Sequence, residues 1–145
     1  MRTLKVLVLL LGTLLPAGCG DDADVELAPV SGKVTTKEGT PVENAVVKFH
    51  PSDTSLQIAP GSSGKTNADG EFTLRTADGQ EGAMVGEHSV SISLVTDDEM
   101  DDSGKSAQNK IHPKYNERSK IKFTVTKAGS DSANFPVEFV KPKSR

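Results

Sequence analysis

The feature that most constrains the fold of this chain is a period-two alternation of apolar and polar side chains that recurs from Pro29 onward. Successive side chains of a β-strand point to opposite faces, so the alternation predicts strands with one buried and one solvated face. The stretches that alternate in this way are 30–35, 45–50, 72–75, 89–94, 121–125 and 135–139. All five phenylalanines fall on the apolar side, which the pattern predicts to face the core.

Glycine-containing turns separate these stretches, and no segment shows the apolar stripe of a helix. Gly39, Gly70 and Gly86 stand where the chain reverses, and we expect positive φ angles there. Residues 52–63 are predicted to form a long loop. Many short strands with glycine-rich turns and no helices indicate one all-β domain, an approximately seven-stranded antiparallel β-sandwich over residues 29–140.

Several stretches of this predicted domain carry a family resemblance. They are Val30–Val34, Gly39–Val42, Ala45–Pro51, Thr66–Phe72, Gly82–Val90 and Ile111–Tyr115. In their turn glycines and strand hydrophobics they resemble the carboxypeptidase regulatory-like domain, a transthyretin-like β-sandwich of small exported bacterial lipoproteins. The resemblance implies this fold and an accessory, non-enzymatic module rather than the zinc enzyme after which the family is named.

The first 18 residues have the three parts of a secretory signal peptide. Arg2 and Lys5 give a positively charged start, residues 6–15 are nearly all apolar, and residues 16–18 are Pro-Ala-Gly. The apolar run has about ten residues, whereas a membrane-spanning helix needs about 20. A buried N-terminal helix of a cytosolic protein is the alternative, but this run has no polar face to present to water.

Cys19 is the only cysteine of the chain and follows the signal-like segment directly. Ala17-Gly18-Cys19 resembles the lipobox of bacterial lipoproteins, which implies cleavage before Cys19 and lipidation of its thiol and new amine. Two or more acyl chains hold a protein firmly on a membrane. We therefore expect lipid attachment at Cys19, an acidic tether over 19–28, and a chain anchored outside the cytoplasm on the cell membrane or outer membrane. An unmodified thiol beside an ordinary cleavage site is the alternative.

The charge of the exported part restricts its partners. Without Arg2 and Lys5, the 17 basic residues fall to 15 against 20 acidic ones, which gives a net charge of −5. Nucleic acids and anionic lipid surfaces require clustered Lys and Arg, so neither is expected to bind this chain through charge. The expected link to the membrane is the covalent lipid on Cys19. We expect the remaining partner to be an envelope protein or a surface polymer. Residues 141–145 form a short basic tail.

Three histidines are the candidates for a metal or catalytic site: His50, His88 and His112. Zinc hydrolases need a close His and Glu pair, and none of the three has a His-x-x-Glu spacing. We expect separate surface or edge histidines, no catalytic residue, no cofactor and no metal, so the chain is not expected to be an enzyme. Hydroxyisourate hydrolases share the transthyretin-like architecture but end in Tyr-Arg-Gly-Ser. This chain ends in Lys-Pro-Lys-Ser-Arg, so that activity is the least favoured alternative.

Residues 97–102 carry five carboxylates in six positions, and they are predicted to form a solvated loop. Calcium binding there stays open as an alternative, because calcium prefers oxygen ligands. The chain has no tryptophan and a single tyrosine, Tyr115, expected to be a packing or turn anchor. The sequence therefore favours a non-enzymatic binding or structural module of the cell envelope, with a cation- or glycan-binding module as the alternative.

Overall fold

The computed structural model describes residues 25–52, 61–94 and 110–141, and within them the chain is all-β. The strands are β1 (Leu27–Ala28), β2 (Val30–Thr36), β3 (Val46–Pro51), β4 (Ser62–Lys65), β5 (Glu71–Thr73), β6 (Arg75–Thr76), β7 (Ala83–Met84), β8 (Gly86–Ser93), β9 (Ile121–Val125) and β10 (Ser130–Val137). One 3-10 turn, η1 (Pro113–Tyr115), precedes β9. No described helix has the length and apolar character that a membrane crossing requires.

Several sequence predictions fall on other parts of the chain. The signal peptide over 1–18, Cys19, the acidic stretch 97–102 and residues 142–145 all lie outside the described residues. The predicted tether, 19–28, overlaps the described part at its end. There Leu27 and Ala28 pair with Met84 and Ala83 as the β1–β7 ladder, so the last two residues of the predicted tether belong to a strand.

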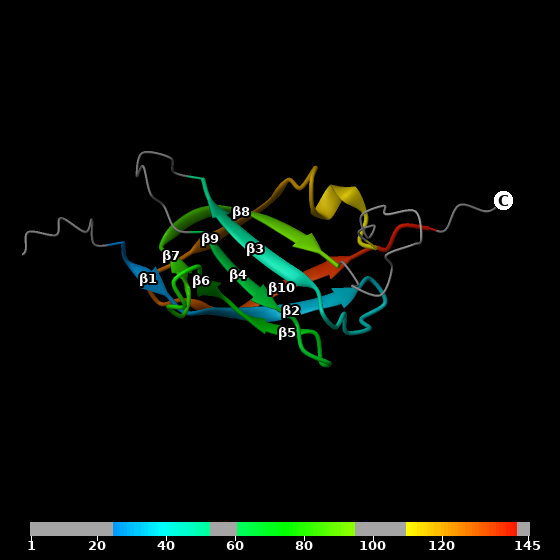
Figure 1. Cartoon of the computed structure of the whole chain (residues 1–145), viewed down its shortest axis with the longest axis horizontal. Coiled ribbons are helices and arrows are strands. Elements are labelled where there is room, and N and C mark those ends of the chain that lie inside the picture. The colour runs from blue at the N-terminus through cyan, green and yellow to red at the C-terminus, as the bar shows by residue number, and fades with distance from the viewer. Residues whose placement is uncertain (1–24, 53–60, 95–109, 142–145) are drawn as a thin grey trace, which may run out of the picture.

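The strands form a three-stranded sheet, β10-β2-β5, a five-stranded sheet, β6-β4-β3-β8-β9, and the small β1–β7 pair. Figure 1 shows the two larger sheets as layers, with β3 and β8 on one side and β2, β5 and β10 on the other. Ring contacts join the layers, since the ring centres of Phe49 on β3 and Phe135 on β10 are 6.2 Å apart. The arrangement is sandwich-like, with ten strands among the described residues against the roughly seven expected.

The expectation of an antiparallel sandwich is wrong for one pair of strands. β10 runs parallel to β2, with Phe135 opposite Val34 and Val137 opposite Thr36, while every other strand pair is antiparallel in the described chain. Alternation of side chains is the same in both orientations, so the pattern carries no signal for this difference.

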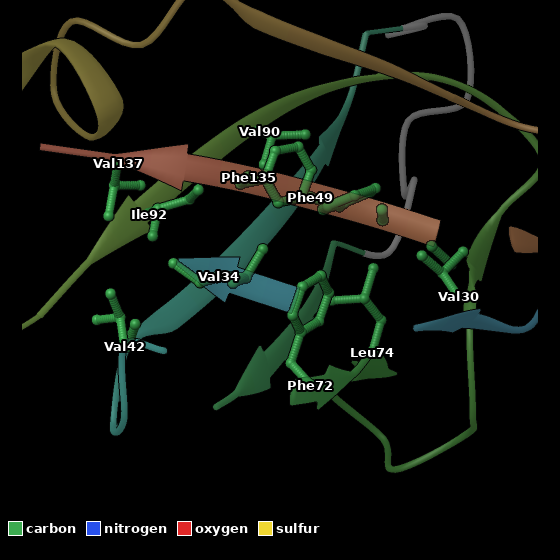
Figure 2. Close-up of a cluster of buried hydrophobic side chains, with 14 of the residues drawn as sticks. Val30, Val34, Val42, Phe49, Phe72, Leu74, Val90, Ile92, Phe135 and Val137 are labelled. Atoms are coloured by element: carbon green, nitrogen blue, oxygen red, sulfur yellow. The ribbon is translucent and has the colours of Figure 1, made fainter. Parts of the chain in front are cut away.

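The core lies between the two larger sheets and is made by the apolar faces that the alternation predicts. Figure 2 shows side chains of β2, β3, β5, β8 and β10 gathered in this space. The fully or nearly fully buried members include Val30, Val34, Val47, Phe49, Phe72, Leu74, Val90, Ile92, Phe135 and Val137. Burial of a large apolar side chain stabilises the fold by roughly 1.5–3 kcal/mol, so this layer is the main source of stability.

The prediction that all five phenylalanines face the core is wrong for Phe139, whose relative exposure is 41%. Val137 is the last residue of β10 and faces Thr36, the last residue of β2. Phe139 therefore lies past the end of the sheet, where only an isolated bridge to Ile111 continues the pairing. Among the described residues, no second layer buries the side chain at that position.

The turn glycines adopt the positive φ angles that were expected at Gly39, Gly70 and Gly86. At Gly70, with φ of 75°, a Cβ atom would also lie 2.5 Å from the carbonyl oxygen of Val34. The turn between β4 and β5 therefore packs against β2 so closely that only glycine fits there.

β4 is a strand that the sequence reading missed, since its first two residues fall in the predicted loop 52–63. It lies between β3 and β6, and Val47 faces Gly64 across the ladder. Its sequence, Ser-Ser-Gly-Lys, has no apolar residue to mark a buried face. Pairing with neighbouring strands makes it a strand, which is a case of tertiary context overriding local propensity.

Candidate functional site

A polar groove lies on the three-stranded sheet β10-β2-β5 and has a volume of about 680 Å³. Val30 and Val34 of β2 point into the core, so the intervening Ser31 and Lys33 lie on the other face of the strand. On β5 the same alternation buries Phe72 and leaves Glu71 and Thr73 exposed. The groove is therefore a direct consequence of the polar half of the alternating pattern.

Lys33 occupies the centre of the groove. The strand register places it opposite Asn134 of β10 on one side and opposite Glu71 of β5 on the other. Its Nζ atom is 3.9 Å from Glu71 Oε1, and the two side chains are 39% and 61% exposed. An ion pair this long and this exposed contributes little to stability, so both charges remain accessible to a ligand.

An irregularity in β10 brings a second acid to the groove. Ser130 is opposite Val30, but Ala133 is opposite Gly32, so β10 carries one residue more than β2 over this interval. This β-bulge contains Asp131, which lines the groove together with Asn134. Bulges re-aim side chains and are common beside binding sites.

Gly32 lets β10 approach the sheet at the bulge. A Cβ atom at this position would lie 2.1 Å from the carbonyl oxygen of Ala133. Any larger residue would have to displace the β10 backbone, which carries Asp131 and Asn134. The glycine of the Val30–Val34 stretch therefore shapes the groove as well as the strand pair.

Lys65, the last residue of β4, and Asn67, in the turn after it, supply the remaining polar wall. Asn67 Oδ1 accepts hydrogen bonds from the backbone N–H groups of Asp69 and Glu71, at 3.0 and 2.9 Å. This is the Asx turn that the Asn-Ala-Asp-Gly sequence is typical of. It holds the start of β5, and with it Glu71, beside the groove.

A charge cluster lies at the end of β10, away from the groove. Glu138 accepts hydrogen bonds from Lys114 Nζ, at 2.6 Å, and from Lys37 Nζ. The hydrogen bond from Lys114, followed by that from Lys37, lowers the pKa of Glu138 from 4.5 to about 2. The cluster ties η1 and the turn after β2 to the last strand.

Tyr115 follows Lys114 in η1 and packs against the core cluster, in agreement with its predicted role as a packing anchor. Lys114 Nζ also lies 5.0 Å from the centre of the Tyr115 ring. The side chain of His112 accepts a hydrogen bond from Lys114 N, at 3.3 Å, and so caps the start of η1.

The three histidines do not converge on a shared site. His50 is exposed on β3, with Nε2 3.4 Å from Ser91 Oγ, and His112 is exposed beside η1. His88 is fully buried, so the prediction of a surface or edge position is wrong for this residue. It lies in phase with Val90 and Ile92 on β8 and therefore points into the core.

Within the described ranges, no group of three or more His, Cys, Asp or Glu side chains is close enough to hold a metal ion. The sequence reading did not single out the groove residues as a site. The sequence signal for them is the alternation of polar and apolar residues in 30–35 and 72–75. The alternation identifies the solvent-facing residues, but it does not show which solvent-facing surface contains a groove.

No protein-family model, curated protein or solved structure matches this chain. The resemblance to the carboxypeptidase regulatory-like domain therefore stays a prediction.

Proposed function

We propose that this chain is a non-enzymatic binding module of the cell envelope, exported and anchored through lipid on Cys19. Its fold would be the transthyretin-like sandwich of carboxypeptidase regulatory-like domains. The signal-like segment 1–18 and the lipobox-like Ala17-Gly18-Cys19 support the anchor. The all-β, sandwich-like arrangement of the described residues supports the fold.

The observation that carries the binding role is the groove on β10-β2-β5. It combines the cations Lys33 and Lys65 with the anions Glu71 and Asp131, and it adds hydroxyl and amide groups between them. Such a lining complements a ligand with charges of both signs and many hydrogen-bonding groups, as a polypeptide segment has.

A sugar chain fits this lining less well. Carbohydrate sites commonly offer an aromatic face for stacking, and the one aromatic residue at the groove, Phe72, is 3% exposed because its ring belongs to the core. We therefore infer that the partner is an envelope protein. Binding of a surface polymer instead would contradict this inference.

The position of the groove suits a tethered module. Figure 1 shows β1 and β7 at one end of the long axis and η1 with the end of β10 at the other. A chain held at Cys19 enters the domain through β1, and the β10-β2-β5 face extends away from that end. A partner could then approach the sheet from the side without displacing the anchor.

Photo-crosslinking in intact cells tests this proposal. A photoreactive amino acid replaces Thr73, which is exposed in the groove, or Lys48, which is exposed on β3 of the other sheet. We expect a protein adduct of defined mass from position 73 and none from position 48. Equal adducts from both positions, or no protein adduct from position 73, contradict the proposed contact face. A glycan adduct from position 73 replaces the protein partner with a surface polymer.

A further inference from the structure

His88 is the one titratable side chain that is fully buried in the described part of the chain. On β8 it faces Pro51 of β3 and Phe123 of β9 across the two ladders. The ring centres of His88 and Phe49 are 5.6 Å apart. The imidazole is thus a member of the apolar layer between the sheets.

The hydrogen bonding of His88 defines its protonation state. Nδ1 lies 3.1 Å from the carbonyl oxygen of Gly86, which can only accept, so Nδ1 carries the proton and donates it. Nε2 is buried and has no hydrogen-bond partner among the described residues. A second proton would therefore place a charged N–H at Nε2 with no acceptor, which is costly in an apolar core.

The charged and titratable groups on the neighbouring strands offer no compensation. On β8 itself, Glu87 is exposed and pairs with Lys122 of β9, at 3.2 Å. On β3 the nearest titratable group is His50, which would itself repel a second positive charge. Across the core, β10 contributes Phe135, which lies against Phe49 and Phe123. No carboxylate of the described residues is buried in this layer.

We propose that His88 is an acid-sensitive switch built into the sandwich, and that proton uptake at Nε2 opens the β3–β8–β9 part of the core. The domain is closed while the imidazole is neutral. In an acidified envelope the open form, in which water can solvate the imidazolium, gains population at the expense of the closed form.

The sign of the pH dependence follows from linkage. Burial lowers the pKa of His88 below its ordinary value of 6.5, against the opposing effect of the Gly86 hydrogen bond, and the nearby His50 lowers it further. The unfolded chain therefore binds the proton first as the pH falls. Stability is fully present above pH 6.5 and is lost between that value and the lower pKa of the folded state.

Urea unfolding of the full chain in detergent, between about pH 5 and 7.5, tests the switch on the wild type and on His88→Phe. The wild-type folding equilibrium constant is expected to fall by up to about tenfold per pH unit below pH 6.5, relative to His88→Phe. The control His50→Gln, at an exposed histidine on the adjacent strand, is expected to keep the fall in stability below pH 6.5, over a slightly narrower pH range because His50 no longer lowers the pKa of His88. Identical pH dependence in the wild type and His88→Phe overturns the proposal.

A second measurement does not depend on how the variant folds. Nitrogen-15 NMR of the wild-type protein is expected to show the His88 imidazole still neutral, with its proton at Nδ1, as the pH falls below the ordinary histidine pKa of 6.5. Protonation of His88 at or above pH 6.5 would overturn the proposal. Hydrogen exchange should in addition show β8 and β9 losing protection first on acidification, and uniform loss over both sheets argues for global acid unfolding instead.

Discussion

Thr66 and Ala45 are joined by two hydrogen bonds in the interior, one donated by each residue. Ala45 N donates to Thr66 Oγ1, at 2.8 Å, and Thr66 N donates to Ala45 O, also at 2.8 Å. The Thr66 hydroxyl in turn donates to Val42 O, at 2.7 Å. One buried hydroxyl therefore fixes the connection between β2 and β3 against the end of β4.

Thr66→Val keeps the shape of the side chain and removes the hydroxyl, so Ala45 N loses its acceptor at a buried position. The free energy of unfolding should fall by about 1–3 kcal/mol, measured by urea titration. Thr73→Val, which removes an exposed hydroxyl on β5, is the control and should change it by less than about 0.5 kcal/mol. Equal effects of the two substitutions would show that the Thr66 bonds do not stabilise the fold.

Removal of a lysine from the charge cluster should raise the pKa of Glu138 from about 2 toward its ordinary value. Lys114→Met should raise it more than Lys37→Met, because the hydrogen bond from Lys114 is the larger cause. Carbon-13 NMR titration of the Glu138 carboxyl measures both shifts. Lys127→Met, which removes the partner of Glu26 at another place, should leave the Glu138 titration unchanged.

The same cluster predicts a contribution to acid stability with a defined sign. Since the folded-state pKa of Glu138 is lowered, its stabilising effect is present above the ordinary carboxyl pKa and is lost as the pH falls toward about 2. Glu138→Gln should therefore weaken the fold at neutral pH and make its stability less dependent on pH below about 4.5, in urea titrations at a series of pH values. A steeper dependence in the variant contradicts the assignment.

Gly32→Ala should destabilise the fold, because the new Cβ atom would collide with backbone rather than with a movable side chain. We expect a loss of about 1–3 kcal/mol in urea unfolding, accompanied by weaker crosslinking from position 73 as β10 shifts. Gly61→Ala is the matched control, since its nearest neighbour, Phe49 O, would be at an ordinary 3.4 Å. A neutral Gly32→Ala would mean that β10 approaches β2 less closely than the bulge requires.

The two phenylalanines at the end of the chain should respond very differently to truncation. Phe135→Ala removes a ring that contacts Phe49, Phe72 and Phe123, and it should cost about 3–5 kcal/mol of unfolding free energy. Phe139→Ala, at an exposed site, should cost less than about 1 kcal/mol. A similar cost at both positions would place Phe139 in a buried contact.

The anchor is testable independently of the fold. Mass spectrometry of the native protein should find Cys19 as the first residue, with diacylglyceryl on sulfur and an acyl group on the amine. Cys19→Ser should move the protein from the membrane pellet to the soluble fraction. An unmodified thiol, or a leader retained on native material, contradicts the lipoprotein assignment.

The alternation predicted the core-facing residues well, because in a strand with one buried face every second side chain is buried. Val47 and Phe49 are buried and Lys48 is exposed, as the alternation requires. The position of His88 was predicted wrongly because its polarity was given more weight than its place in the alternating pattern. Its parity on β8 indicated burial, whereas its polarity suggested the surface, and parity was correct.

Features that depend on distant parts of the chain were not predictable from local pattern. The polar strand β4 becomes a strand through its ladder to β3, and Phe139 is exposed because β2 ends opposite Val137. The groove needs the approach of β10 to β2 at Gly32, which brings together residues about 100 positions apart. No short window of sequence contains that information.

The parallel pairing of β10 with β2 also sets the order in which the molecule can be completed. Among the described strands, β2 is one of the first to be synthesised and β10 is the last, so one side of β2 stays unpaired until β10 is made. Closing such a distant contact is slow relative to forming hairpins. The three-stranded sheet, and with it the groove, can therefore be completed only after β10 has been synthesised.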